Sequence, residues 1–138
     1  MTIHGLGSHS VMDALSQSKF EFHLTGSRYF GNSTAESDYD FYADYTADGI
    51  RPFLKSLGFV AQRKYDGLAQ YHDVNIAEVW QHKIANIHIQ LQKDMAMKKY
   101  AQQVMKIFYP SWVTVAKAQR HHWWNRAYMV AKLEIPKP

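Results

Sequence analysis

Strict alternation of apolar and polar residues over positions 85–92 constrains the fold of this chain more than any other feature of its sequence. Side chains on an extended strand point to opposite faces in turn, so this pattern is typical of a strand with one buried face. The apolar face is formed by Ile87, Ile89 and Leu91, and the polar face by Asn86, His88 and Gln90. The preceding segment 76–82 is predicted to be its partner strand in a hairpin.

The rest of the chain predicts further strands and helices around this hairpin. Strands are expected at 20–24, which runs into Thr25-Gly26-Ser27, at 38–45 and at 59–63, with a turn at Tyr65-Asp66-Gly67. Helices are expected at 8–18 after Ser8, at 46–57 between Thr46 and Gly58, at 93–109, and from Ser111 after Pro110. The chain is thus predicted to be a single α+β domain over residues 1–138. Its mixed or antiparallel central sheet would span about 20–92, with flanking helices and C-terminal helices at about 93–133.

Composition narrows the classes of function. The 138 residues contain no apolar run close to the roughly 20 needed to cross a bilayer, and the N-terminus lacks a signal-peptide pattern. We therefore expect a cytoplasmic protein with no membrane partner. The chain has no cysteine, which excludes disulfides and thiolate chemistry. The formal charge of +4, with strongly basic sequence from Lys83 onward, favours a phosphate-bearing ligand, although a solvated basic surface explains the same asymmetry.

Two carboxylates on the predicted strand 38–45 offer metal ligands. Asp38 and Asp40 would project from the same face, about 6–7 Å apart at their Cα atoms. Their side chains can converge on one cation, and oxygen ligands of this kind suit Mg²⁺ that also binds substrate phosphates. The pair therefore predicts a metal site.

The turn that follows the predicted strand 20–24 offers phosphate-binding groups. Gly26 allows close backbone approach, exposed N–H groups can cradle a phosphate, and Ser27 adds a hydroxyl donor. Arg28 is placed to bind a phosphate in a bidentate manner, or alternatively to pair with Asp38 or Glu36.

Together, the segments Gly26-Ser27-Arg28 and Ser37-Asp38-Tyr39-Asp40 resemble the signature of the nucleotidyltransferase superfamily that includes DNA polymerase beta. The resemblance is closest to a small stand-alone branch. It implies a minimal nucleotidyltransferase fold and the transfer of a nucleoside monophosphate from a nucleoside triphosphate such as ATP to a hydroxyl acceptor. The acceptor would be a nucleic-acid end, a protein side chain or a small molecule. Carried over, Gly26, Ser27, Arg28 and Ser37 bind the nucleotide phosphates, and Asp38 and Asp40 are catalytic ligands of Mg²⁺ or Mn²⁺.

The chain departs from this family at the third acid, which the family places on a later strand beside the paired carboxylates. Here His88 stands at that position, and a neutral imidazole can bind a metal or act as a general base. His88 is therefore the candidate third catalytic group, with Glu78 as the alternative third ligand. A partly buried histidine that bonds a neighbour explains His88 equally well. Loss of the acid also motivates a second hypothesis, a catalytically silent protein of this fold that acts by binding a nucleotide, a protein or a nucleic acid as an inhibitor or regulator.

A final cluster at 120–126 interleaves cations with tryptophans, in a form that can stack a base and bind phosphates. Trp123 also fits the apolar stripe of a helix, so core packing explains at least one of these rings. His121 and His122 are adjacent on a helix and cannot face one metal, so no zinc site is expected. The cluster makes a plain nucleic-acid-binding module the third hypothesis.

Overall fold

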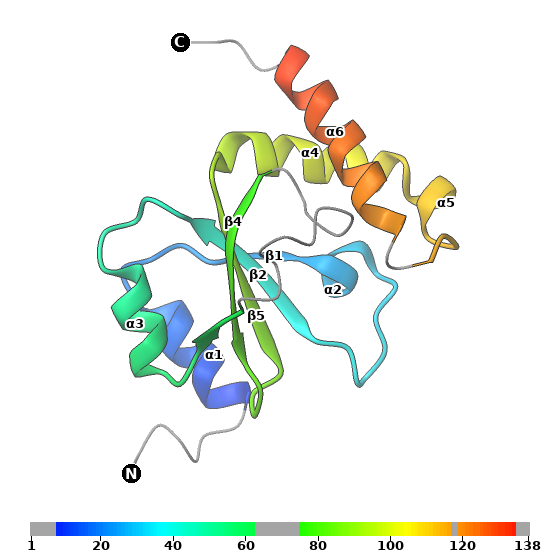
Figure 1. Cartoon of the computed structure of the whole chain (residues 1–138). Coiled ribbons are helices and arrows are strands. Elements are labelled where there is room, and N and C mark those ends of the chain that lie inside the picture. The colour runs from blue at the N-terminus through cyan, green and yellow to red at the C-terminus, as the bar shows by residue number, and fades with distance from the viewer. Residues whose placement is uncertain (1–7, 63–74, 117–118, 135–138) are drawn as a thin grey trace.

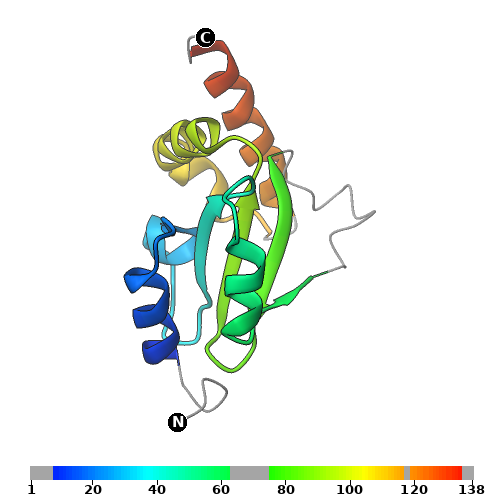
Figure 2. The same ribbon diagram turned by 90° about the vertical axis from the view of Figure 1, so that its left-hand side faces the viewer.

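The computed structural model describes residues 8–62, 75–116 and 119–134, which form a five-stranded sheet with helices on one face and across one end (Figure 1, Figure 2). The strands are β1 (His23–Thr25), β2 (Tyr39–Asp44), β3 (Val60–Ala61), β4 (Ile76–His82) and β5 (Ile87–Gln92). The helices are α1 (Ser8–Gln17), α2 (Gly26–Phe30), α3 (Ile50–Ser56), α4 (Met95–Ile107), α5 (Tyr109–Trp112) and α6 (Arg120–Glu134). The predicted α+β fold with a mixed sheet, flanking helices and a C-terminal helical segment is confirmed.

The strand order is β1-β2-β5-β4-β3, so the strands that carry the candidate site residues are neighbours. β2 and β5 are parallel, with Asp40 opposite His88, and the other three pairs are antiparallel. β4 and β5 form the predicted hairpin, whose connection includes Asn86 at a φ of 58°. A parallel pair needs a long connection, and here α3 and the β3–β4 pair supply it.

The apolar face of the sheet is buried under α1 and α3. The side chains at 87, 89 and 91 are all fully buried, as the alternation predicts. They meet Val11 and Leu15 of α1 and Ile50 and Leu54 of α3 in one core. Burial of this kind fixes the register of β5, because a slip by one residue would turn the apolar side chains to the opposite face.

A second apolar cluster joins α4, α5 and α6, and Phe30 of α2 packs against it. The ring of Phe30 lies 5.0 Å from that of Trp112, so the turn after β1 is tied to the C-terminal helices. α4 begins at a side-chain cap, because Asp94 accepts a 3.0 Å hydrogen bond from the Met97 amide. Within the described ranges, none of the helices combines the length and apolar character needed to cross a membrane.

The predicted N-cap of α3 is wrong. The helix is preceded by Gly49, at a φ of 81°, and not by Thr46. Asp44 Oδ1 accepts hydrogen bonds from the amide and the hydroxyl of Thr46, at 2.8 and 2.7 Å. The hydroxyl that was expected to cap the helix therefore closes a turn directly after β2. Gly58 follows the helix as predicted, at a φ of 98°.

Other element boundaries also differ from the sequence prediction. β1 begins only at His23, because Phe20 leaves the sheet and packs on Phe53 with 5.3 Å between ring centroids. The helix predicted from Ser111 is divided into α5 and α6, and Pro110 lies in the first turn of α5, where it needs no amide donor. β3 is shorter than the predicted strand. The predicted turn Tyr65-Asp66-Gly67 lies outside the described residues.

An ion pair between α3 and β4 stabilises the packed helix. Arg51 Nη2 lies 2.8 Å from Glu78 Oε2, and Arg51 Nε donates to both carboxylate oxygens at 3.1 and 3.0 Å. Trp80 Nε1 donates to the same carboxylate at 3.0 Å. The hydrogen bonds from Arg51, and then that from Trp80, hold the pKa of Glu78 below its ordinary value of 4.5, although burial opposes the shift.

Glu78→Gln is expected to lower the free energy of unfolding at neutral pH by about 1 kcal/mol or less, because the side chains of Glu78 and Arg51 are 31% and 36% exposed. A lowered carboxyl pKa contributes stability above the ordinary pKa, and this stability is lost as the pH falls through the lowered value. The difference between variant and wild type should therefore vanish in acid. Urea unfolding at pH 7 and at pH 3 measures it, with the exposed Glu36→Gln as control. A difference that grows in acid would contradict this account.

Candidate metal and nucleotide site

Asp38, Asp40 and His88 converge on the polar face of the sheet. The parallel register sets Asp40 directly beside His88, and Asp38 lies just before β2. His88 Nδ1 is 3.2 Å from Asp38 Oδ2 and 3.2 Å from Asp40 Oδ1. All three side chains are partly exposed, at 34%, 22% and 23%. The alternation predicts that these residues share a face, and the structure brings their polar atoms into contact distance.

The separations among these atoms fit a single divalent ion. Each of the three residues offers one ligand atom, and these atoms lie within 4.8 Å of one another. Ligands about 2.1 Å from an octahedral Mg²⁺ stand roughly 3 Å apart at neighbouring positions. The 3.2 Å distances from His88 Nδ1 to the two carboxylates match that spacing. Among the residues that the structure describes, this is the group of three His, Asp or Glu side chains whose ligand atoms lie close enough together to bind one ion.

Gly26 brings the backbone of the turn against Asp40. It is the first residue of α2, its φ is 72°, and the preceding Thr25 pairs with Asp40 across β1 and β2. A Cβ atom at this position would lie 2.3 Å from Asp40 Oδ2. Only glycine therefore allows the turn and the carboxylate to lie this close. The prediction that Gly26 follows the end of a strand is confirmed.

Gln102 of α4 holds β1 in place beside the turn. Its side-chain oxygen is hydrogen-bonded to the Thr25 hydroxyl, and its Nε2 donates to the Leu24 carbonyl at 3.1 Å. Thr25 and Gln102 are both buried. The helix that borders the site thus fixes the strand that leads into Gly26.

Arg28 holds the loop before β2. Its Nη2 donates to the Ser37 carbonyl at 2.8 Å, and to the carbonyls of Thr34 and Ala35 at 3.4 Å each. The guanidinium also stacks on Tyr39, 3.9 Å from the ring centroid. Tyr39 packs against the sheet core and so points away from the face of Asp40. These contacts give Arg28 a role in positioning the loop, and its predicted phosphate contact stays a prediction.

Ser37 also contributes to the loop. Its Oγ accepts a 2.8 Å hydrogen bond from the Thr34 amide and lies 3.4 Å from the Thr34 hydroxyl. The loop conformation brings Asp38 to the start of β2. A phosphate contact by Ser37 remains a prediction.

Glu78 does not join the candidate metal ligands. It is paired with Leu91 across β4 and β5, so its side chain lies on the buried face of the sheet, opposite the face of His88. Its carboxylate is bonded to Arg51 and Trp80. The alternative that Glu78 supplies the third ligand is therefore wrong, because strand alternation turns it to the other face.

A pocket of about 230 Å³ opens beside the Asp40 carboxylate. Gly26, Ser27 and Asp40 form one part of its wall, and the C-terminal helices form another. Sequence reasoning did not single out most of these residues as a site. The lining includes Thr25, Phe30, Asn32, Ile76, Gln90, Lys98, Trp112, Arg120, His121 and Trp124. The basic and aromatic cluster at the start of α6 thus shares a pocket with Asp40, one of the candidate metal ligands.

Lys98 is the buried cation of this pocket, with only 1% of its surface exposed. Its Nζ lies 3.7 Å from the ring centroid of Trp124 and 3.5 Å from Gln90 Oε1. A charged side chain is rarely buried without partners, because the loss of hydration is costly. The sequence carried a signal for it, since Lys98 shares one helix face with the buried Ala101 and Met105. A cation within an apolar stripe marks a position with a specific role.

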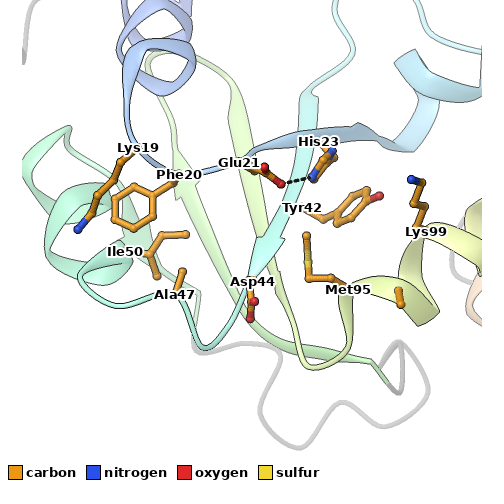
Figure 3. A pocket seen from close by; sticks show the side chains of 11 residues that line it. Lys19, Phe20, Glu21, His23, Tyr42, Asp44, Ala47, Ile50, Met95 and Lys99 are labelled. Carbon is orange, nitrogen blue, oxygen red and sulfur yellow. Dashed lines mark ion pairs between the residues drawn. The ribbon is translucent and has the colours of Figure 1, made fainter. Parts of the chain in front are cut away.

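A larger pocket, of about 460 Å³, lies farther along the polar face (Figure 3). In Figure 3 the ring of Tyr42 lies beside His23, whose Nε2 is 3.5 Å from Glu21 Oε2. Burial, and then the nearby Tyr29, raise the pKa of Tyr42. Lysines and carboxylates both line this pocket, but none of the three candidate metal ligands does. The smaller pocket is therefore the candidate site.

Comparisons of the chain with protein-family models, with curated proteins and with solved structures found no match. The resemblance to nucleotidyltransferases accordingly depends on the residues of this chain alone. What that resemblance implies about activity, metal and nucleotide is a proposal.

Proposed function

We propose that this protein is a metal-dependent nucleotidyltransferase that moves a nucleoside monophosphate from a nucleoside triphosphate to a hydroxyl acceptor. One observation supports the proposal above the others. Three candidate metal ligands, Asp38, Asp40 and His88, converge on the polar face, and one of them, Asp40, lines a pocket that also contains the turn at Gly26 and the buried Lys98. A phosphate chain needs these groups together: a cation-binding centre, close backbone approach and fixed positive charge.

The size and charge of the pocket fit the polyphosphate part of a nucleotide. Sites for drug-sized ligands begin at about 300 Å³, so a pocket of about 230 Å³ suits a fragment of a nucleotide and not all of it. Lys98 is held against the face of Trp124, so that face is already occupied and is not open for a base. We therefore place the phosphates between Ser27 and Lys98, with the nucleoside directed outward.

The side chains then have separate tasks in the transfer. A divalent ion would supply positive charge to the phosphate oxygens and the acceptor hydroxyl when bound. Asp38, Asp40 and His88 would hold it, Gly26 lets the phosphates approach, and Lys98 stabilises charge on the departing pyrophosphate. The acceptor oxygen forms a bond to the α-phosphorus, the bond to the bridging oxygen breaks, and the hydroxyl proton passes to water.

Isotopic labelling separates this proposal from the alternative of a catalytically silent binding protein. That alternative is motivated by His88, which stands where the family has an acid. The protein is incubated with Mg²⁺ or Mn²⁺ and nucleoside triphosphates labelled at the α or the γ position, together with oligonucleotide, protein and small-molecule acceptors. Transfer of the α label alone, with equimolar pyrophosphate, supports a nucleotidyltransferase. The silent alternative would be supported if nucleotide or partner binding were unchanged by substitution of both aspartates and by removal of the metal, and if no pyrophosphate were released.

Lys98→Met is expected to weaken triphosphate binding by about tenfold to a hundredfold, since a hydrogen bond to a charged group contributes about 1.5–3 kcal/mol. Methionine keeps most of the apolar stem and removes the charge. Titration calorimetry with a triphosphate and with the matching nucleoside measures the effect, and the nucleoside should bind equally to both proteins. Lys99→Met is the matched control, because the neighbouring Lys99 is exposed and lines the larger pocket. Equal losses in the two variants would refute a specific role for Lys98.

A further inference from the structure

We infer that the site selects a first-row transition ion such as Mn²⁺ over Mg²⁺, because His88 binds the metal directly through Nδ1. The inference deepens the proposed function and rests on it for the position of the ion. It concerns the identity of the metal, which two aspartates alone would leave to hard cations.

The orientation of His88 is the first support. Its Nδ1 is equally far, 3.2 Å, from one oxygen of each aspartate, so this nitrogen stands where a third ligand of the same ion would stand. A histidine that supported only one carboxylate from outside the ligand set would bond one of them and leave the other free. Here one atom faces both.

The sheet fixes that orientation. Ile87 and Ile89, on either side of His88, are completely buried, so the strand cannot turn the imidazole away from the polar face. The parallel pairing with Asp40 also sets the side chains of β2 and β5 next to each other. His88 is therefore held among the ligands and is not a mobile surface residue.

The donor set determines the class of ion. Mg²⁺ prefers oxygen ligands and keeps several waters, whereas imidazole nitrogen suits transition ions. Affinity at a site with nitrogen ligands rises from Mn²⁺ through Fe²⁺ to Co²⁺ and beyond. Two carboxylates balance the charge of one divalent ion. A neutral imidazole in place of a third acid attracts a hard cation less strongly, and it supplies a softer nitrogen ligand. Selectivity should therefore move from Mg²⁺ toward Mn²⁺.

The test measures binding of Mn²⁺ alone and of Mg²⁺ alone, without nucleotide, to the full chain and to three variants. His88→Asp restores an acid, so the ratio of the Mg²⁺ to the Mn²⁺ dissociation constant should fall. The expected decrease is at least about tenfold, because changing a residue that only contacts a metal ligand already alters metal affinity by about that factor. His88→Ala should lower the same ratio and weaken Mn²⁺ binding. His23→Ala, an exposed histidine on the same face, should change neither.

Pulsed electron paramagnetic resonance of bound Mn²⁺ provides a second readout. Coupling to one imidazole nitrogen is expected in the wild type and should be absent from His88→Ala and His88→Asp. A role for His88 outside the ligand set predicts instead that both metals weaken equally and that no directly bonded nitrogen is detected. Either of these results would overturn the inference.

One further measurement and one substitute variant distinguish loss of binding from loss of folding. Thermal unfolding of each variant without metal shows whether it folds, and His88→Asn serves as a substitute if His88→Ala does not. Nitrogen-coupled Mn²⁺ without any nucleotidyl transfer would leave this inference intact while the proposed activity fails. Transfer supported equally by Mg²⁺ and Mn²⁺, without nitrogen coupling, would leave the activity intact and refute the choice of metal.

Discussion

Gly26→Ala is expected to lower metal affinity and nucleotidyl transfer by about a hundredfold, as a displacement of about 1 Å at a reacting centre does. The reason is steric: the added Cβ would lie 2.3 Å from Asp40 Oδ2, so the carboxylate must move away from His88. A left-handed backbone also disfavours alanine, at a cost of about 1–3 kcal/mol in the free energy of unfolding. Calorimetry with Mn²⁺, the label-transfer assay and urea unfolding measure the three effects.

Gly31→Ala is the matched control for this prediction. Gly31 follows α2 with a φ of 89°, so alanine meets the same backbone strain there, but no atom lies within 4 Å of the added Cβ. Both variants should lose stability through backbone strain, and only Gly26→Ala should also lose metal binding. Equal metal affinity in the two variants would show that the position of Asp40 does not depend on the close approach of Gly26.

Asp40→Asn is expected to abolish detectable transfer and to weaken metal binding by about a hundredfold or more. This loss exceeds the effect of changing a residue that only contacts a metal ligand, because Asp40 is proposed to be a ligand itself. Asparagine keeps the shape of the side chain and removes its charge. Because Asp38 and Asp40 are like charges in close proximity, the free energy of unfolding should be unchanged or higher. Loss of function without loss of stability separates a ligand from a structural residue. The same assays and urea unfolding provide the measurement.

Asp44→Asn is the control on the same strand and the same face. Its carboxylate bonds Thr46 and takes no part in the group around His88. We expect a small change in stability and none in metal affinity. Label transfer that persists unchanged in Asp40→Asn, or in Asp38→Ala combined with Asp40→Ala, would refute the proposed assignment.

Periodicity alone predicted which face of its strand each candidate ligand occupies. Asp40 lies between Tyr39 and Phe41 and His88 between two isoleucines, and Asp38 shares the face of Asp40 because it lies two residues earlier; this local property can be read from the sequence. The contact between them depends on β2 and β5 being adjacent and parallel, with Asp40 opposite His88. Pairing between distant strands has no local signature, so only the resemblance to a known family suggested it.

The errors have equally specific causes. Glu78 was considered as a ligand because it lies on the neighbouring strand, but the register turns it toward Arg51 on the opposite face. The apolar stripe of α4 predicts that Lys98 is buried, but its place beside Trp124 depends on how α4 packs against α6. Thr46 was assigned to a helix cap, whereas the side chain of Asp44 competes for the same hydroxyl. For Glu78 and Lys98 the decisive contact joins distant elements, whereas for Thr46 it is a competing local turn.

Asp40 and His88 are 48 residues apart in the sequence, so one is synthesised well before the other. During synthesis, the three candidate ligands cannot meet until β5 has left the ribosome, so an ion at this site would bind only after β2 and β5 have paired. Mass action then favours the native state, by about 2.7 kcal/mol when the free ion stands at 100 times its dissociation constant. Protection of the intact chain from proteolysis by added Mn²⁺ would therefore report occupancy of the site before any acceptor is identified.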